Sequence, residues 1–133
     1  KLVDGGTNRR SFTYIDDAIH ALIKIIENKN GITTGKIYNI GNPKNNHSIR
    51  EVAEIAFELA PSYPHFRERI HEVKIIGITA HKHYGEGYQD MINRTPYIRN
   101  TEHDLAWKPK TTLRQALKGT FAAHVADLDR KQT

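Results

Sequence analysis

IDDAIHALIKIIE, residues 15–27, and KIYNIG, residues 36–41, are the stretches of this sequence that decide the fold. In the first, apolar residues return every three or four positions, which predicts an amphipathic helix over Ile15–Glu27. Asp16 and Asp17 fall in its first turn, where the helix dipole favours anions, and the NKNG sequence at 28–31 ends it. The second stretch predicts a short strand closed by a GNP turn. A helix followed by a strand points to an α/β protein.

Further elements follow on the C-terminal side. Ser48 and Glu51 form a capping box for a helix that stops before Pro61, and Thr112 and Gln115 do the same for the last helix. A second strand is predicted at 73–78, a helical turn at 101–104, loops at 61–69 and 81–93, and fraying after residue 129. The strand at 36–41 has no obvious neighbours in the chain, and a lone strand is not stable. We therefore expect the chain to be a piece of a longer protein.

Composition excludes several classes of protein. The 133 residues make one domain, and they contain no cysteine, which excludes disulfides, thiolate metal sites and cysteine nucleophiles. No apolar run approaches the roughly 18 residues of a membrane-spanning helix. A net charge of +5 favours a polyanionic partner, either a nucleic acid or a phosphorylated small molecule. Because the basic residues are dispersed rather than gathered in a stripe, we do not expect a nucleic-acid partner.

The histidines raise the question of a metal. On an extended chain His81 and His83 would lie close together, with Glu86 or Asp90 as a third ligand. Zinc sites need three or four convergent ligands, so solvated loop histidines are the simpler interpretation and we expect no metal site. The sequence has no glycine-rich dinucleotide loop, no Walker A motif and no Gly-x-Ser-x-Gly motif.

Two segments are candidates for ligand binding. GGTNRR, residues 5–10, joins a glycine turn, which lets a ligand approach the backbone, to two guanidiniums that suit phosphate. It also reads as an ordinary turn with surface arginines. In residues 84–96, tyrosines in a glycine-rich loop suit packing on a base or sugar, and Arg94 suits a carboxylate or phosphate. A solvent loop anchored by its tyrosines explains the same pattern.

Four motifs carry a resemblance to a known family: LVDGG at 2–6, R-x-F-x-x-I-x-D at 10–17, IYNIG at 37–41 and LAWKP at 105–109. Together they resemble the C-terminal portion of extended short-chain dehydrogenase/reductases, which act on nucleotide sugars. More narrowly, YGEGYQD at 84–90 with RTPYIRN at 94–100 is similar to the UDP-glucuronate decarboxylase half of the bifunctional polymyxin-resistance enzymes. The resemblance covers essentially the whole chain. Ala106 departs from the family's usual Leu-Gly-Trp-x-Pro, which we expect to be a mild packing change.

The resemblance implies an α/β, Rossmann-like fold in which residues 1–133 form the C-terminal substrate-binding portion. The helix at 15–27 and the strand at 36–41 would complete the Rossmann sheet. The NAD-binding glycine loop and the catalytic Tyr-x-x-x-Lys lie upstream in that family. NAD is therefore expected to be bound by the absent N-terminal part, and this chain alone is expected to be inactive. Because the strand predicted at 36–41 would expose an unpaired edge, we also expect the chain to self-associate or swap elements.

The resemblance also implies a reaction. UDP-glucuronate is oxidised at C4 and loses CO₂, giving a UDP-4-keto-pentose for the 4-amino-4-deoxy-L-arabinose of lipid A and for polymyxin resistance. Arg94 corresponds to the family's proton donor. Because a guanidinium has a pKa above about 12 and is a poor acid, we expect Arg94 at least to hold the carboxylate or the developing enolate. Arg10 would contact the phosphates. The implied substrate-binding residues are Lys1, Leu2, Val3, Asp4, Gly5, Gly6, Thr7, Asn8, Arg9, Arg10 and Tyr88.

Alternatives remain open at this stage. Another nucleotide-sugar epimerase or dehydratase has no carboxylate to lose, so it would not depend on Arg94. A UDP-xylose synthase would reuse the NADH to reduce the ketone. A binding module without chemistry would show no preference for uridine diphosphate. For the whole enzyme, the resemblance implies a cytoplasmic homo-oligomer.

Overall fold

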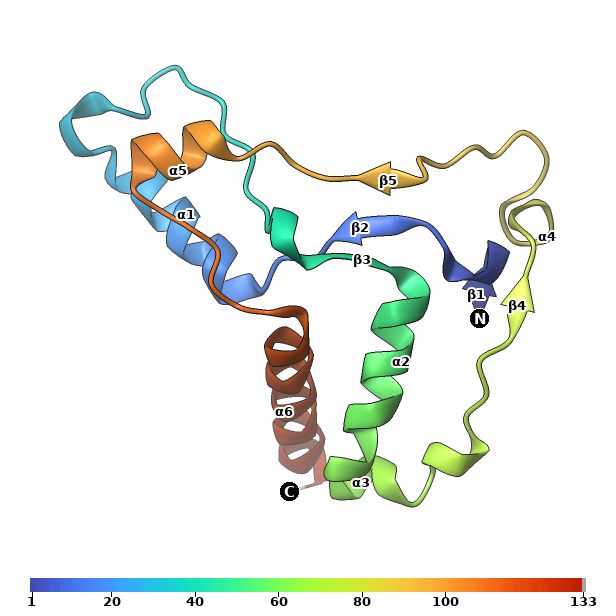
Figure 1. Ribbon diagram of the computed structural model, residues 1–133. Helices are drawn as coiled ribbons and strands as arrows, with labels where there is room; N and C mark the ends of the chain where they lie inside the picture. The colour runs from blue at the N-terminus through green and yellow to red at the C-terminus, as the bar shows by residue number, and fades with distance from the viewer. Residues whose placement is uncertain (133) are drawn as a thin grey trace.

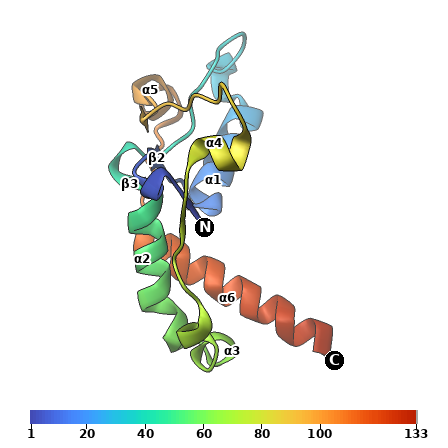
Figure 2. The same cartoon turned by 90° about the vertical axis from the view of Figure 1, so that its right-hand side faces the viewer.

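A computed structural model describes residues 1–132 of the chain. Three short strands cross the top of the molecule, α2 and α6 descend from them, and α1 and α5 pack together at one end (Figure 1). In Figure 2, α6 slants away from α2 toward its C-terminal end. The strands are β1 Leu2–Val3, β2 Arg9–Ser11, β3 Asn46–Ser48, β4 Gly77–Ile78 and β5 Asn93–Arg94. The α-helices are α1 Ile15–Glu27, α2 Ile49–Leu59, α3 Pro64–Arg67, α4 Ala80–Tyr84, α5 Arg99–Leu105 and α6 Leu113–Gln132, with 3-10 turns at 4–6, 29–31, 43–45, 60–62 and 70–72.

The strands form two small sheets. β2 lies in the middle of the larger one, antiparallel to β3 and parallel to β5, and β1 pairs with β4 in parallel. The register places Arg10 of β2 directly opposite Arg94 of β5. The α/β fold class predicted from the sequence is confirmed. None of the helices in the described residues is long and apolar enough to cross a membrane.

The strand predictions were wrong in detail. Residues 36–41 form no strand, and Ile37 is 92% exposed. The segment is tied instead through Asn39, whose carbonyl accepts from Thr101 Oγ1 at 2.7 Å and whose Nδ2 donates to the Tyr97 carbonyl at 3.0 Å. A strand needs a ladder partner, and within the described residues this segment has none. The strand predicted at 73–78 shortens to Gly77–Ile78, where β1 supplies the partner.

The helix predictions fared better. α1 has the predicted bounds and ends at Asn28, which adopts a left-handed conformation with φ 41°. The capping box of α2 is present, with Glu51 N donating to Ser48 Oγ at 3.0 Å and Ser48 N donating to the Glu51 carboxylate at 2.7 Å. Two predicted loops contain short helices, α3 and α4. The helix was predicted to fray after Asp129, but α6 continues to Gln132, so the prediction was wrong for those residues. Thr133 lies outside the described residues.

The apolar stripe of α1 faces away from the core. Its buried side carries Asp17 and Ala21, with Ile25 half-buried against the core, whereas five other large aliphatic residues are exposed by between 42% and 81%. These exposed residues, the α1 stripe, are Ile15, Ile19, Leu22, Ile23 and Ile26. They recur at the spacing of one helix face, so together they form a continuous apolar surface.

We therefore expect the 133-residue chain to self-associate through the α1 stripe. Replacing Ile23, which is 47% exposed, with glutamate places a charge in that surface and should lower the average mass measured by light scattering at high concentration. The matched control is Ile76→Glu, which adds the same charge at an isoleucine that is 50% exposed and lies outside both the stripe and residues 36–41. A wild-type chain that stays monomeric would contradict this expectation.

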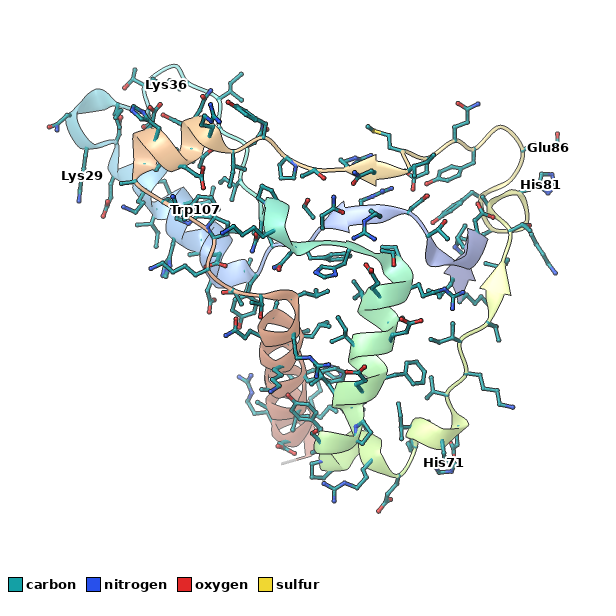
Figure 3. The ribbon with its side chains drawn as sticks, viewed as in Figure 1. Lys29, Lys36, His71, His81, Glu86 and Trp107 are labelled. Atoms are coloured by element: carbon teal, nitrogen blue, oxygen red, sulfur yellow. The ribbon has the colours of Figure 1, made fainter. Side chains whose placement is uncertain are left out.

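The core lies between α1 and α5. It consists of Ala21, Ile98, Leu105 and Trp107. Trp107, labelled beside α1 in Figure 3, is 4% exposed, and its Nε1 donates to the Asp17 carbonyl at 2.9 Å. The Asp17 carboxylate accepts from the backbone N–H groups of Lys110 and Thr111 at 3.1 and 2.9 Å. Asp17 therefore anchors the whole 107–111 segment against α1.

A polar cluster fixes residues 36–38 to α5. Asp104 accepts from Lys36 Nζ at 2.7 Å and from the Tyr38 hydroxyl at 3.0 Å. The hydrogen bond from Lys36, followed by those from His103 and Tyr38, holds the pKa of Asp104 well below its usual range. The carboxylate is therefore ionised near neutral pH and holds the segment that lacks a strand partner.

Ala106 stands where the motif of the resembling family usually has glycine. A mild packing change was expected there, but the structure shows a consequence for the backbone conformation. Ala106 caps α5 with φ 44° and ψ 46°, the left-handed conformation in which a Cβ costs about 1–2 kcal/mol. Glycine removes that strain, but it also lowers the free energy of unfolding by about 0.4–1 kcal/mol because it gives the unfolded chain more conformational freedom. We expect Ala106→Gly to stabilise the chain by about 0.5–1 kcal/mol in urea unfolding. The control, Ala122→Gly within α6, should destabilise it, because glycine is unfavourable inside a helix; an unchanged or lower stability for Ala106→Gly would contradict the strain.

Candidate functional site

A cavity of about 570 Å³ lies between the N-terminal segment and the residues that run from α4 to β5. That volume suits a small-molecule ligand. Seven of the predicted substrate-binding residues line it: Lys1, Val3, Asp4, Gly6, Asn8, Arg10 and Tyr88. The two segments predicted as ligand-binding from the sequence therefore meet at one cavity.

The turn at residues 4–6 shapes the N-terminal wall. Asp4, Gly5 and Gly6 all have positive φ, at 45°, 72° and 69°. A Cβ on Gly6 would lie 3.0 Å from the backbone nitrogen of Arg50, so glycine is needed there for conformation and for space. Asp4 Oδ1 accepts from Ala80 N at 2.9 Å, which ties the turn to the start of α4.

Arg10 joins the two walls. Its Nη2 donates to the Asp90 carboxylate at 2.5 Å, and its Nη1 donates to the carbonyls of Met91 at 2.8 Å and Arg9 at 2.7 Å. Burial alone would raise the pKa of Asp90, but hydrogen bonds from Asn8 and the Met91 amide, with the charges of Arg10 and Arg94, outweigh it and lower that pKa. Asp90 is therefore a carboxylate near neutral pH.

An aromatic stack forms the opposite wall. The Tyr88 ring stacks on Tyr84 with centroids 4.1 Å apart, and Tyr84 meets the edge of His83 at 4.6 Å. Burial, followed by the charge of Asp90, raises the pKa of Tyr88, so its phenol stays protonated. Tyr88 is 44% exposed. It thus offers both a ring face and a hydroxyl donor to a ligand.

Arg94 lies at the edge of the cavity rather than in its lining. It is exposed on β5, in register with Arg10, and side chains of directly paired residues share one face of a sheet. Its charge reaches Tyr88 and Asp90, since it opposes the rise in the pKa of Tyr88 and contributes to the lowering of the pKa of Asp90. No carboxylate in the described part of the chain forms an ion pair with it. Arg94 is therefore available to an anionic group of a ligand that extends out of the cavity.

Four predicted substrate-binding residues do not line the cavity: Leu2, Gly5, Thr7 and Arg9. Leu2 is buried, and the Gly5 carbonyl accepts from Arg50 Nε at 2.9 Å. Arg9 alternates with Arg10 along β2, pairs with Glu51 at 3.3 Å, and donates to the Asn46 carbonyl at 2.5 Å. The structure thus gives Leu2, Gly5 and Arg9 contacts that support the wall.

Two residues of the site were not predicted for ligand binding from the sequence pattern. His83, which extends the aromatic wall beside the predicted Tyr84, and Asp90 were considered only as possible metal ligands. Asp90 pairs with a residue 80 positions away, a contact that no local pattern predicts.

The histidine pair does not converge. His81 and His83 lie two residues apart on α4, not on an extended chain, so they project from different sides of the helix. His81 lies 3.5 Å from Glu86, and neither residue lines the cavity. Figure 3 shows both at the outer edge of the molecule beside α4. Within residues 1–132, no group of three His, Cys, Asp or Glu residues is placed to hold a metal ion.

Comparison with known proteins finds a family match over the N-terminal part of the chain. Residues 1–41 match the family described as NAD dependent epimerase/dehydratase. These residues include the glycine turn, β2 and α1, and the match agrees with the Rossmann-like short-chain dehydrogenase/reductase fold predicted from the motifs.

Among solved structures, the chain is similar to the PbgP3 protein from Burkholderia pseudomallei, with 46% sequence identity and a TM-score of 0.77. The similarity covers 95% of this chain and 35% of the PbgP3 chain. This chain therefore spans about a third of that relative's length. Together the two matches show that its fold is that of a fragment of a Rossmann-like short-chain dehydrogenase/reductase.

Proposed function

We propose that this chain is the substrate-binding part of an NAD-dependent UDP-glucuronate decarboxylase. One observation carries the proposal: two arginines stand in register on adjacent strands, Arg10 inside the cavity and Arg94 at its edge, with the Tyr88 ring nearby. UDP-glucuronate has two separate anionic groups, a diphosphate and a carboxylate. A pair of guanidiniums beside an aromatic face complements a ligand of that kind.

Each side chain has a role in this proposal. Arg10 binds the diphosphate, and the stacked Tyr88 and Tyr84 pack against the uridine or sugar. Arg94 holds the sugar carboxylate. When the C5–C6 bond breaks, its electron pair moves toward C4 and negative charge develops on the C4 oxygen. The positive charge of Arg94 nearby would stabilise that oxygen without releasing a proton.

NAD does not fit the residues described here. In residues 1–132 no glycine-rich loop joins a strand to a long helix, since the Gly5–Gly6 turn leads into β2. Under this proposal the oxidation at C4 belongs to a part of a longer enzyme that precedes this chain. The exposed α1 stripe and the unpaired residues 36–41 support that arrangement, because both are surfaces that a neighbouring sheet layer would cover.

The test uses the full reading frame that encodes this chain, mixed with NAD⁺ and UDP-glucuronate. Both CO₂ release and absorbance of NADH are followed. CO₂ with stoichiometric NADH supports the keto-pentose-forming decarboxylase. CO₂ without net NADH indicates an enzyme that reduces the ketone to UDP-xylose. An absence of CO₂ overturns the decarboxylase proposal.

The second candidate is another nucleotide-sugar epimerase or dehydratase. The match of residues 1–41 to that broad family favours it. Such an enzyme needs the diphosphate site around Arg10 but has no carboxylate for Arg94 to hold. Turnover of a neutral UDP-hexose, with no CO₂ from UDP-glucuronate, would identify it.

A further inference from the structure

Arg10 is held from two distant segments. The two protons of Nη1 go to the carbonyls of Arg9 and Met91, and one proton of Nη2 goes to Asp90. A guanidinium carries five N–H donors. Within the described residues, this arrangement leaves Nε–H and the second Nη2–H for a ligand. Two such donors form the fork with which arginine binds phosphate.

Asp90 is itself fixed in place. Its Oδ2 accepts from Asn8 Nδ2 at 3.1 Å as well as from Arg10, and its Oδ1 accepts from Met91 N at 2.8 Å. The side chains of Arg10 and Asp90 are only 23% and 26% exposed. The carboxylate thus takes hydrogen bonds on both oxygens and is screened from water on most sides.

All of these groups border the same cavity. Asn8, Arg10, Tyr88 and Asp90 line it, so Asp90 lies next to the place where a phosphate would meet Arg10. A carboxylate there has two opposite effects on an anionic ligand: it repels the ligand, and it orients the guanidinium that binds it. Hydrogen bonds to both of its oxygens neutralise part of its charge and so weaken the repulsion, whereas the contact that orients the guanidinium is direct.

We infer that Asp90 is a positioning residue, which holds the Arg10 guanidinium so that its free edge binds the phosphates of a nucleoside diphosphate. This inference rests on the proposed function, in which the cavity binds UDP-glucuronate. Without Asp90, the long Arg10 side chain would sample other rotamers, and binding would bear the cost of ordering it.

The test compares UDP with uridine as ligands of the 133-residue chain, using ligand-observed NMR titrations. Both ligands reach the aromatic wall, but only UDP carries phosphates. We expect Asp90→Ala to weaken UDP binding about tenfold, the size of coupling between contacting polar groups, and to leave uridine binding unchanged. Glu86→Ala is the matched control, since it removes a carboxylate from the same segment that is 92% exposed.

A second comparison separates positioning from a general structural role. In an Arg10→Ala background, Asp90→Ala should cause no further loss of UDP affinity. Unchanged or tighter UDP binding by Asp90→Ala overturns the inference, as does an equal loss for UDP and uridine. If the wild-type chain binds neither ligand, the proposed function falls together with the inference. Asp90→Asn, which keeps the side-chain volume, repeats the measurement if the alanine variant does not fold.

Discussion

Under the proposed function, replacing Arg94 with alanine in the full reading frame that encodes this chain is expected to lower the rate of CO₂ release from UDP-glucuronate about 10²–10³-fold. That is the usual cost of removing one group that stabilises developing negative charge. Because Arg94 does not line the cavity that holds Arg10, the loss should appear mainly in kcat and only weakly in the affinity for UDP. Steady-state kinetics with a CO₂ readout, together with UDP titrations, separate the two effects.

Two further variants test whether the effect is specific to Arg94 and whether it depends on positive charge. Arg99→Ala removes a nearby guanidinium that sits 6.0 Å from the Tyr97 ring centroid, and it should leave the rate unchanged. Arg94→Lys keeps a positive charge and should recover part of the activity if the role is electrostatic. If Arg94→Ala releases CO₂ at the wild-type rate, Arg94 does not hold the substrate carboxylate, and the epimerase or dehydratase candidate is favoured.

Local signals in the sequence predicted α1 and α2 well. Helix periodicity and the Ser48–Glu51 capping box depend on residues three or four apart, so they are visible without the fold. β3 and β5 were not predicted, because they are only three and two residues long and each pairs with β2 across about 37 and 84 residues of sequence. The strand predicted at 36–41 failed for the converse reason: its pattern is right, but the chain offers it no ladder partner.

The candidate site was also predicted only in part from the sequence. Gly5-Gly6, Arg10 and Tyr88 were visible because glycine turns, arginines and loop tyrosines have recognisable chemistry. The pairing of Arg10 with Asp90 depends on the packing of two segments and has no sequence signal of its own. The placement of Arg9 also needed the fold, since only the alternation of side chains along β2 turns it toward Glu51 and away from the cavity.

Replacing Asp17 with alanine is expected to destabilise the chain by about 3 kcal/mol. Asp17 is 7% exposed, and its carboxylate is the acceptor for two backbone N–H groups of residues 110 and 111. Removing it leaves two partly buried donors without that partner, and an unsatisfied donor costs up to about 1–3 kcal/mol. For a domain of this size, the loss corresponds to a melting temperature lower by roughly 10 °C.

Asp16→Ala is the matched control for this last prediction. Both aspartates lie in the first turn of α1, so both variants lose the same favourable interaction with the helix dipole. Asp16 is exposed, whereas Asp17 also anchors the segment that carries Trp107. The difference in melting temperature between the two variants therefore measures the anchoring alone. Equal melting temperatures would mean that residues 107–111 are held by the burial of Trp107, and that the Asp17 carboxylate contributes no more than its charge.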